Sequence, residues 1–399
     1  MIPVDEALAR ILSHFQPVAG ELVGVGEAVD RVLAADVVAR VTQPPTAVSA
    51  MDGWAVRGSD LATLPATLTR IGEAPAGRPY TGTVAPGQAV RLFTGSVIPD
   101  GADTVVLQED CDDLGHAVRV REGTPGRWVR AAGLDFTAGT VGLRAGRRLT
   151  VRDVALAAAM NHPFLTVRRR PRVAILATGD EVVMPGEPLG PGQIVSSNGL
   201  ALAALVRRHG GIPVNLGIAP DDADTLGILA RGAAGCDLLV TTGGASVGEH
   251  DLIRNVLGAQ GLELDFWKIA MRPGKPLMFG RLGATPLLGL PGNPVSSLVC
   301  AALFLVPALR RLQGLDPAEP HRARAALGAP LPANDRRQDY LRATLRPGDG
   351  ALPIATTFGQ QDSSMLSRLA AADCLIVRPP HAPAAEAGDT VDIVPLDGI

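Results

Sequence analysis

The strongest fold signal in this 399-residue sequence is a strand–loop–helix pattern that repeats between Arg172 and Leu312. Uninterrupted apolar runs end in loops rich in Gly, Asp and Pro, and helical stretches follow. The predicted strands are Val173–Ala177, Ile212–Ile218, Asp237–Val240 and Leu287–Leu290, and helices are expected from Asn198 to His209 and from Val295 to Leu312. Strands that are apolar on both faces predict a doubly wound α/β domain, in which helices cover both sides of a parallel sheet.

The segments that flank this domain follow other patterns. Residues 4–15 and 150–161 space their apolar side chains as helices do, and Thr150 suits an N-cap. Short strands are expected between these helices, at Ala89–Phe93, Thr104–Gln108 and Ala117–Val120, and again after Pro317, at Tyr340–Leu345, Cys374–Arg378 and Thr390–Val394. We therefore predict a multidomain α/β chain. Its domains are an N-terminal helical and extended domain (1–45 and 141–171), an inserted β-rich domain (46–140), the doubly wound α/β domain (172–317) and a C-terminal β-barrel-like domain (318–399).

Composition argues against several classes of function. Hydrophobic residues make up 46% of the chain and charged residues 19%, so a large core can form. Aromatic residues make up only 3% and the net charge is −3, which argues against a nucleic-acid partner. The most apolar stretch, residues 295–309, is too short for a membrane span and contains Pro307. Residues 1–6 lack the pattern of a signal peptide, and we expect a cytoplasmic protein with four reduced cysteines, Cys111, Cys236, Cys300 and Cys374.

Two loops that follow predicted strands suit an anion. Residues 241–248 contain three glycines and three hydroxyl side chains, so their amides and hydroxyls can cradle a phosphate. A plain tight turn is the alternative. In residues 291–296, Asn293 fits a helix N-cap and Pro294 fits the first helical position. The amides of Val295 and Ser296 would then point outward, with the positive end of the helix behind them.

The charged residues suit an oxyanion and a divalent cation. Only two of the 37 basic residues are lysines, Lys268 and Lys275, and Arg272 lies between them in a segment stiffened by Pro and Gly. A shaped oxyanion site explains this segment better than a solvated surface run. Arg168-Arg169-Arg170 is interpreted as a solvated domain boundary. Single loop carboxylates suit Mg²⁺ held by one or two acids plus substrate phosphate, with a turn or cap role as the alternative for each; they are Asp52, Glu181, Asp221 and Asp251.

Together these motifs resemble the molybdopterin molybdenumtransferase family, the group that contains bacterial MoeA and the gephyrin E domain. The matching segments follow the family's order over nearly the whole chain. They are Ser49–Ala55 (SAMDGWA), Phe93–Gly95 with Pro99–Asp103, Arg130 with Asp135, Thr178–Glu181 (TGDE), Ser197–Asn198, Thr242–Gly248 (TGGASVG) with Asp251, Met271–Pro276 (MRPGKP), Leu290–Ser296 (LPGNPVS), Arg337–Arg342 (RQDYLR) and Ser363–Ser367 (SSMLS). The glycine loop alone is not specific, because the adenylyltransferase that precedes this family in the pathway has a similar one. The N-terminal and C-terminal segments distinguish the two.

The resemblance implies an activity, an assembly and a site. The activity is insertion of molybdate into adenylylated molybdopterin with release of AMP, supported by Mg²⁺ or another divalent cation. The assembly is a homodimer whose clefts lie between the α/β domain of one subunit and the N-terminal domains of the other. The adenylyltransferase and the molybdoenzymes that accept the cofactor are candidate further partners. The implied catalytic residues are Asp52, Thr94, Arg130, Asp135, Glu181, Asp221, Asp251, Lys268 and Lys275, with Asp52, Asp221 and Asp251 as metal ligands.

The implied substrate-binding residues come mainly from the loops after the strands. They are Thr242, Gly243, Gly244, Ser246, Gly248, Arg272, Pro291, Gly292, Asn293, Pro294, Ser296, Arg337 and Ser363, with Ser364 as the alternative register for the last. Molybdate is a dianion, so cations would attract it while hydroxyls donate directional hydrogen bonds. The sequence shows no protein nucleophile, so direct attack on the phosphoanhydride by molybdate oxygen or water is the simpler hypothesis.

Two other functions remain open from the sequence. The first is the adenylyltransferase reaction, which would adenylylate molybdopterin from ATP without molybdate. The second is a non-catalytic scaffold, as the gephyrin relation allows. The acids at Asp52, Asp221 and Asp251, together with Lys275, argue against a scaffold.

Overall fold

The structure is a computed structural model of the chain, and it describes residues 1–243, 252–259, 261–317, 322–348 and 350–397. Its central element is a six-stranded sheet with the order β16–β13–β17–β21–β20–β18. Four neighbouring strands are parallel: β16 (Ile212–Ala219), β13 (Arg172–Thr178), β17 (Leu238–Thr242) and β21 (Thr285–Leu290). The last two, β20 (Met278–Leu282) and β18 (Leu262–Trp267), are antiparallel. The sheet is therefore mixed rather than wholly parallel.

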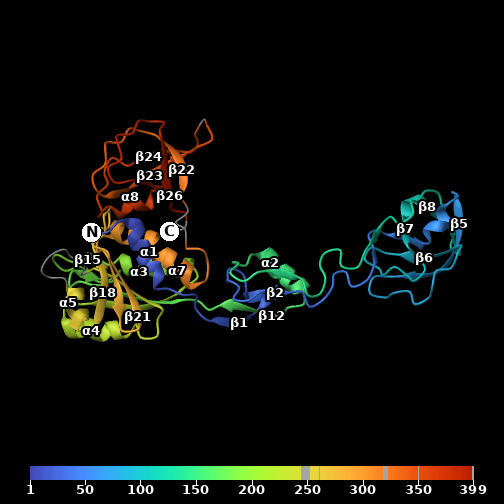
Figure 1. The fold of residues 1–399 in the computed structure, drawn as a ribbon, viewed down its shortest axis with the longest axis horizontal. Helices are drawn as coiled ribbons and strands as arrows, with labels where there is room; N and C mark the ends of the chain where they lie inside the picture. The colour runs from blue at the N-terminus through green and yellow to red at the C-terminus, as the bar shows by residue number, and fades with distance from the viewer. Residues whose placement is uncertain (244–251, 260, 318–321, 349, 398–399) are drawn as a thin grey trace.

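Helices cover both faces of this sheet, as predicted for a doubly wound domain (Figure 1). Alternate residues of β13 point to opposite faces: Val173 and Ile175 join one core cluster, while Ala174 and Leu176 join the other. The first cluster includes α3 (Asn198–Arg208), α6 (Pro294–Cys300) and α7 (Val306–Leu312). The second includes α4 (Ala223–Arg231) and α5 (Leu252–Ala259). A short parallel pair, β14 (Val182–Val183) and β15 (Ile194–Val195), lies in the loop between β13 and α3.

The first helix, α1 (Val4–Ser13), belongs to this core by packing. Val4, Ala7, Ile11 and Phe15 are buried in the same cluster as α3 and α7. The helix at the start of the predicted N-terminal domain (1–45) therefore packs against the α/β core. Three apolar residues of the predicted helix 4–15, Val4, Ile11 and Phe15, are buried, and they face the α/β domain.

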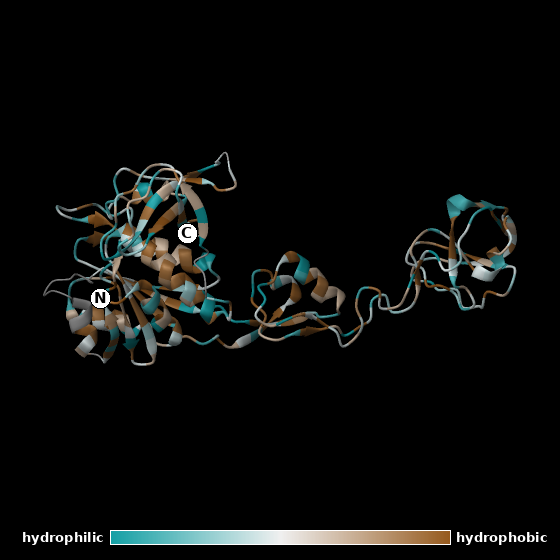
Figure 2. Ribbon diagram, turned by 45° about the horizontal axis from the view of Figure 1, so that its top comes forward, coloured by the Kyte–Doolittle hydropathy of each residue, from teal (hydrophilic) through white to brown (hydrophobic). Residues whose placement is uncertain are grey.

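The apolar helix after β21, predicted from Val295 to Leu312, begins one residue earlier. It spans Pro294–Leu312 as α6, a π-helical turn (Ala301–Leu305) and α7, and Val306 N–H bonds the Ala301 carbonyl just before Pro307. Its 19 residues are long and apolar enough to cross a membrane by length and composition, so the prediction that it is too short was wrong. However, 78% of the most apolar stretch is buried inside the protein, and the helix lies among the hydrophobic helices of the large body (Figure 2).

A narrow arm projects from this body (Figure 1). Its middle domain contains β1 (Gly20–Gly24) paired with β12 (Phe164–Arg168), β2 (Val37–Val38) paired with β11 (Val141–Leu143), the short helix η1 (Val25–Glu27) and α2 (Val151–Ala159). These elements share one core that contains Leu33, Leu149 and Val167. The predicted cap of α2 is confirmed: the Thr150 side chain accepts from Asp153 N–H, and Asp153 accepts from Thr150 N–H at 2.8 Å.

The distal domain lies at the far end of the arm and is rich in β-structure (Figure 1). Its curled sheet has the order β7 (Thr104–Leu107), β4 (Gly53–Val56), β6 (Gln88–Leu92), β5 (Ala66–Ala74), β9 (Ala117–Val120) and β8 (Cys111–Asp113). The pair β3 (Val48–Ser49) and β10 (Val129–Arg130) and the short helices η2 (Gly58–Leu61) and η3 (Gln108–Asp110) complete it. A Cβ on Gly53 would lie 2.0 Å from the Val106 carbonyl oxygen, so β4 and β7 can approach only with glycine at that position.

The C-terminal domain contains a closed five-stranded barrel. β23 (Gln338–Arg346), β24 (Ile354–Thr357), β22 (Ala323–Leu327), β26 (Thr390–Pro395) and β25 (Cys374–Arg378) form a ring that closes where β25 pairs with β23. The short strand β19 (Met271–Arg272) extends from the α/β domain and pairs with the first residues of β23, with Arg272 opposite Asp339. Helix α8 (Leu366–Ala370) packs near α6. All four cysteines are free, and three of them are buried.

Candidate functional site

The loops after the parallel strands are joined by a hydrogen-bond network centred on Asn198. Its side-chain amide donates to the Thr242 hydroxyl at 2.9 Å and to the Gly292 carbonyl at 2.7 Å. The Thr242 hydroxyl in turn donates to the Pro291 carbonyl at 3.3 Å. The carboxyl ends of β17 and β21 are thus fixed to the start of α3, which is the edge where ligands bind in open α/β sheets.

Gly243 begins the predicted phosphate loop in a conformation that requires glycine. Its φ is 92°, and a Cβ there would lie 2.4 Å from the Thr178 carbonyl oxygen. Four predicted residues of this loop and its flank, Gly244, Ser246, Gly248 and Asp251, lie outside the described residues. The loop therefore leaves β17 close against the end of β13.

The start of α6 is tied to the C-terminal domain through Ser363. The Asn293 side chain donates to the Ser363 hydroxyl at 2.8 Å, and Val295 N–H donates to the Ser363 carbonyl at 3.2 Å. Pro294 is in the first turn, as predicted, but Asn293 makes no side-chain cap and the Val295 amide does not point outward unpaired. Ser364 bonds to Asp362 instead, so Ser363 is the serine at this loop. Ser296 is buried in the first turn of the helix.

The predicted cations differ in how far their charge is neutralised. Lys275 is half-buried, and no described residue forms a hydrogen bond or an ion pair with its ammonium. The Lys268 ammonium lies 3.6 Å from the centroid of the Trp267 ring, and the residue has a φ of 77°. Lys275 is therefore the cation most available to an anionic ligand.

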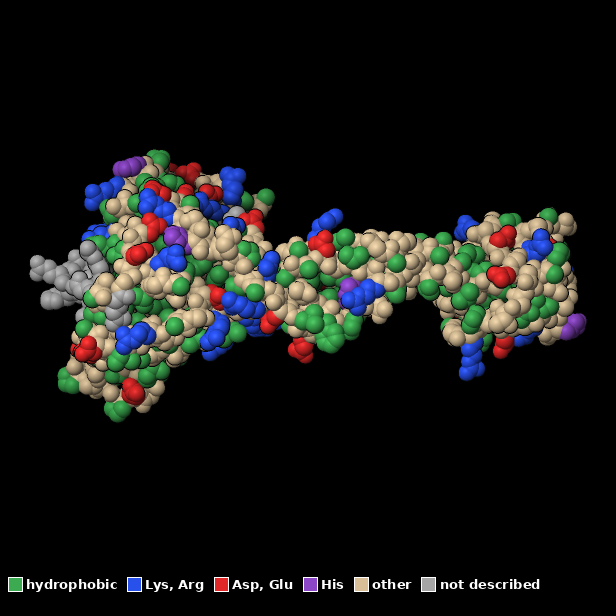
Figure 3. All heavy atoms as spheres, turned by 60° about the horizontal axis from the view of Figure 1, so that its bottom comes forward, with side chains coloured by type: hydrophobic (Ala, Val, Ile, Leu, Met, Phe, Trp, Pro, Cys, Tyr) green, Lys and Arg blue, Asp and Glu red, His purple; other side chains and the backbone are tan. Residues whose placement is uncertain are grey.

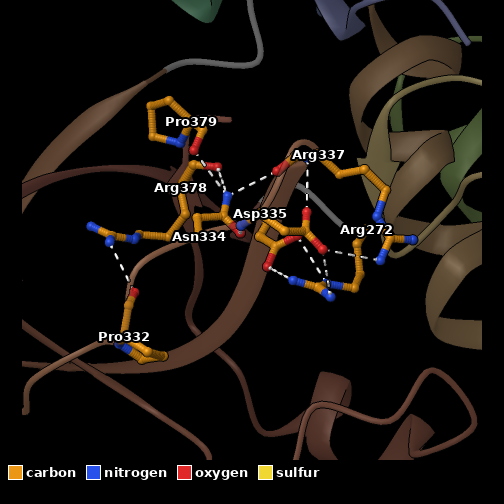
Figure 4. A network of polar contacts seen from close by, with 8 residues as sticks. Arg272, Pro332, Asn334, Asp335, Arg337, Arg378 and Pro379 are labelled. Carbon is orange, nitrogen blue, oxygen red and sulfur yellow. Dashed lines mark hydrogen bonds and ion pairs between the residues drawn. The ribbon is translucent and has the colours of Figure 1, made fainter. Parts of the chain in front are cut away.

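Arg272 is held by carboxylates rather than free. Its guanidinium forms a bidentate pair with Asp339, at 2.9 and 2.5 Å, and lies 3.5 Å from Asp335. Arg337 also lies 3.5 Å from Asp335, and Asn334 supports the same turn through the Arg337 and Arg378 carbonyls (Figure 4). The hydrogen bond to Asp339 raises the pKa of Arg272. The main contact of Arg272 therefore links β19 to β23, and carboxylates balance its positive charge.

Three acids gather near the end of β13. Asp221 N–H donates to the Asp180 carboxylate at 2.9 Å, and the Glu181 carboxylate lies against Gly179. Partial burial, followed by the negative charges of Asp180 and Glu181, raises the pKa of Asp221. Asp180 is a neighbour that the predicted site did not include. Within the described part of the chain, no three His, Cys, Asp or Glu side chains are arranged to hold a metal by themselves.

A second group of predicted residues lies in the distal domain. Thr94 donates to one carboxylate oxygen of Asp52 through its backbone N–H at 2.7 Å and its hydroxyl at 2.8 Å. These bonds, helped by the charge of Arg91, lower the pKa of Asp52. The Arg91 guanidinium lies 5.5 Å from the Trp54 ring and donates to the Gly53 carbonyl at 3.2 Å. Arg91 is a neighbour that sequence reasoning missed.

Arg130 and Asp135 line one cavity in this part of the chain. The cavity has a volume of about 470 Å³, and Gly95, next to Thr94, also lines it. Residues 43–46 also line it. The four predicted residues of the arm, Asp52, Thr94, Arg130 and Asp135, therefore belong to one neighbourhood.

The two groups of predicted residues lie at opposite ends of the molecule (Figure 1). The first, called here the strand-end half-site, contains Lys275, Ser363 and the Asn198 network. The second, called here the arm half-site, contains Asp52, Thr94, Arg130 and Asp135. Asp52 and Asp221 are consequently not brought together within one chain, and the third predicted metal ligand lies outside the described residues. A single chain does not assemble the predicted metal triad.

Comparisons with known proteins match nearly the whole chain. Three family models match in order: the MoeA N-terminal region (domain I and II) over residues 2–161, a probable molybdopterin binding domain over 174–311 and the MoeA C-terminal region (domain IV) over 324–396. The molybdopterin molybdenumtransferase of Nostoc sp. is 38% identical over 369 residues, with 90% of this chain and 85% of the relative covered. That of Haemophilus influenzae is 33% identical, with 100% and 99% covered.

A solved structure shows the same architecture. The molybdopterin biosynthesis MoeA protein from Pyrococcus horikosii matches with a TM-score of 0.87 and 30% identity, and all of both chains is covered. The match includes the arm and the C-terminal barrel, which lie on either side of the molybdopterin-binding domain. The chain therefore belongs to the MoeA family.

Proposed function

We propose that this chain inserts molybdate into adenylylated molybdopterin, with release of AMP, in molybdenum cofactor biosynthesis. The observation that supports this most is the strand-end half-site. At this edge Asn198 joins Thr242, at the end of β17, to Gly292, before α6, and Lys275 has no side-chain partner among the described residues. The relatives are named molybdopterin molybdenumtransferases, and an anion site at this edge would suit the molybdate and phosphate of the proposed reaction.

Molybdate would bind near Lys275 and Ser363. Among the described residues no carboxylate pairs with the Lys275 ammonium, and the Ser363 hydroxyl, which accepts from Asn293, has its own proton to donate. Arg337 adds partly shielded positive charge, since it shares Asp335 with Arg272. Arg272 would act indirectly, by fixing the turn that carries Arg337.

The adenylate phosphate would bind at the glycine loop. Gly243 allows the backbone to pass close to Thr178, and Asn198 holds the neighbouring Thr242 in place. Backbone amides in such a loop donate to phosphate oxygens without side-chain rearrangement.

The acids near β13 are chemically suited to Mg²⁺ or another divalent cation. Partial burial and then the neighbouring negative charges raise the pKa of Asp221, and a cation would relieve the repulsion. Asp221 and Glu181 would hold the cation together with substrate phosphate, and it would stabilise charge on the departing AMP. The chain's own residues bind and orient the substrates, so that molybdate oxygen or water attacks the phosphoanhydride without a protein nucleophile.

We further propose that the working enzyme is a cytoplasmic homodimer. The arm half-site is remote from the strand-end half-site of its own chain, and a second copy related by a twofold axis could bring one of each together. Asp52 and its partner Thr94 would then complete the cleft of the other subunit. The adenylyltransferase that supplies the substrate and the molybdoenzymes that accept the product are proposed as transient partners.

The test is AMP release from adenylylated molybdopterin, measured with and without molybdate and Mg²⁺. We expect release to need both, and Lys275→Gln to lower it strongly. Arg346→Gln, which removes an exposed cation of β23, is the matched control and should leave the rate unchanged. Robust adenylylation of molybdopterin from ATP without molybdate would contradict the proposal.

A further inference from the structure

A cavity lined by arginines lies where the middle domain meets the α/β domain. Its volume is about 150 Å³, and it opens beside residues 168–170 and 207–210, which precede β13 and β16. It is therefore at the edge where the strands begin, opposite the strand-end half-site. Basic side chains gather at this junction (Figure 3). The arginines that line the cavity are Arg31, Arg148, Arg168, Arg169, Arg170, Arg207 and Arg208, and the one acid in its lining is Asp30.

Three of these arginines are paired with carboxylates. Arg148 lies 3.1 Å from Asp30, Arg169 lies 2.6 Å from Asp237, and Arg31 is paired with Glu21. These three ion pairs hold their arginines in place in the lining of the cavity.

The other four arginines have no carboxylate partner among the residues that the structure describes. Arg168 donates to the Val18 carbonyl at 3.0 Å and Arg208 donates to the Asp397 carbonyl, while Arg170 and Arg207 have no side-chain partner there. Among the described residues, no carboxylate balances the charge of these four guanidinium groups; Arg168 is half-buried, and Arg170, Arg207 and Arg208 are exposed. The interpretation of residues 168–170 as a solvated boundary holds for Arg170, which is exposed, but not for Arg168 and Arg169, which are half-buried and hydrogen-bonded.

We propose that this cavity binds a compact multivalent phosphate, with the size and charge of a diphosphate group. Guanidinium forks match phosphate oxygens bidentately and hold their charge at every physiological pH. The volume corresponds to the space of about five water molecules, which suits one or two phosphate groups. A bound anion would reduce the mutual repulsion of the four arginines.

Binding there would also fix the arm. The cavity is lined by Arg31 and Arg168 of the middle domain, by the end of α3 and by Gln313 after α7. One anion would therefore bridge the arm and the body at the junction that sets the arm's direction.

The experiment is isothermal titration of the full-length protein with inorganic pyrophosphate, with orthophosphate and ADP as further arms. It is run in the Lys275→Gln background, which weakens anion binding at the strand-end half-site. We expect one saturable site per chain, weakened roughly tenfold or more by adding Arg170→Gln and Arg207→Gln, since each removes a charged hydrogen bond. Binding of ADP as tightly as pyrophosphate would support a diphosphate carried on a nucleotide, and weaker binding of ADP would support the free anion.

The matched control adds Arg144→Gln and Arg231→Gln, which remove the same charge from exposed sites away from the cavity. It should leave the affinity within about twofold, since only screened, long-range attraction changes. The proposal is overturned if pyrophosphate shows no saturable binding, or if the control weakens binding as much as the cavity variant. It is also overturned if light scattering shows that the cavity variant changes the oligomeric state, because these arginines would then face a second copy.

Discussion

The separation of the two half-sites makes a sharp prediction about mixed dimers. Asp52→Asn disables the arm half-site and Lys275→Gln disables the strand-end half-site, so each variant alone should be nearly inactive. In a twofold dimer with clefts shared between subunits, a mixed dimer of the two variants has both lesions in one cleft and none in the other. Random pairing of equal amounts makes half of the dimers mixed. The mixture should therefore recover roughly a quarter of the wild-type rate of AMP release.

The assay uses co-expressed chains with two different affinity tags, so that the mixed dimer can be purified. The purified mixed dimer should show about half of the wild-type rate, because one of its two clefts is intact. Wild-type chains carrying the same tags are the control for purification. Inactivity of the purified mixed dimer would refute the reasoning, because it would mean that Asp52 and Lys275 act within one chain.

Three further predictions concern single contacts. Because Thr94 lowers the pKa of Asp52, the Asp52 carboxylate stays charged to lower pH than usual. Thr94→Val should raise this pKa and move the acid limb of the pH–rate profile to higher pH. An unmoved acid limb would argue against the role of Asp52. Gly53→Ala forces a Cβ against the neighbouring strand and should destabilise the distal domain by about 1–3 kcal/mol in urea unfolding, whereas an unchanged midpoint would contradict the close approach of β4 and β7. Arg272→Ala leaves the buried Asp339 carboxylate unpaired and should lower the free energy of unfolding by about 2 kcal/mol. Part of this loss should be absent when Asp339→Ala is added. Strict additivity of the two single-variant losses in the double variant would show that the pair contributes nothing.

The parallel strands could be predicted because they are buried on both faces. β13 and β17 are continuous apolar runs followed by Gly-containing loops, and both were found at the predicted places. β18 (LELDFW) was missed because it alternates polar and apolar residues, as a half-exposed antiparallel edge strand does. The sheet order and the closure of the C-terminal barrel depend on pairings between distant segments, which local patterns do not encode.

Motifs in the sequence could identify single residues of the candidate site, but they could not predict how those residues are arranged. Single positions such as Gly243 and Ser363 could be chosen from motifs; in the structure Gly243 lies close against Thr178, and Ser363 accepts a hydrogen bond from Asn293. The pairing of Arg272 with a carboxylate could not be predicted, because its partner Asp339 is 67 residues away and meets it only through the pairing of β19 with β23. Asn198 was part of a matching motif, but its place at the centre of the strand-end network follows from the fold alone.

The placement of α1 in the central core has a consequence for the order in which the chain folds during synthesis. The core needs both α1 and α7, so it cannot close until the ribosome has passed Leu312. The distal domain is complete soon after Arg130, and the middle domain after Arg168. Because domains generally fold as units while the chain emerges, the outermost part of the arm should form first and the body last. Until then the apolar face of α1 is not buried, so α1 must avoid aggregation until the segments that pack against it have been synthesised.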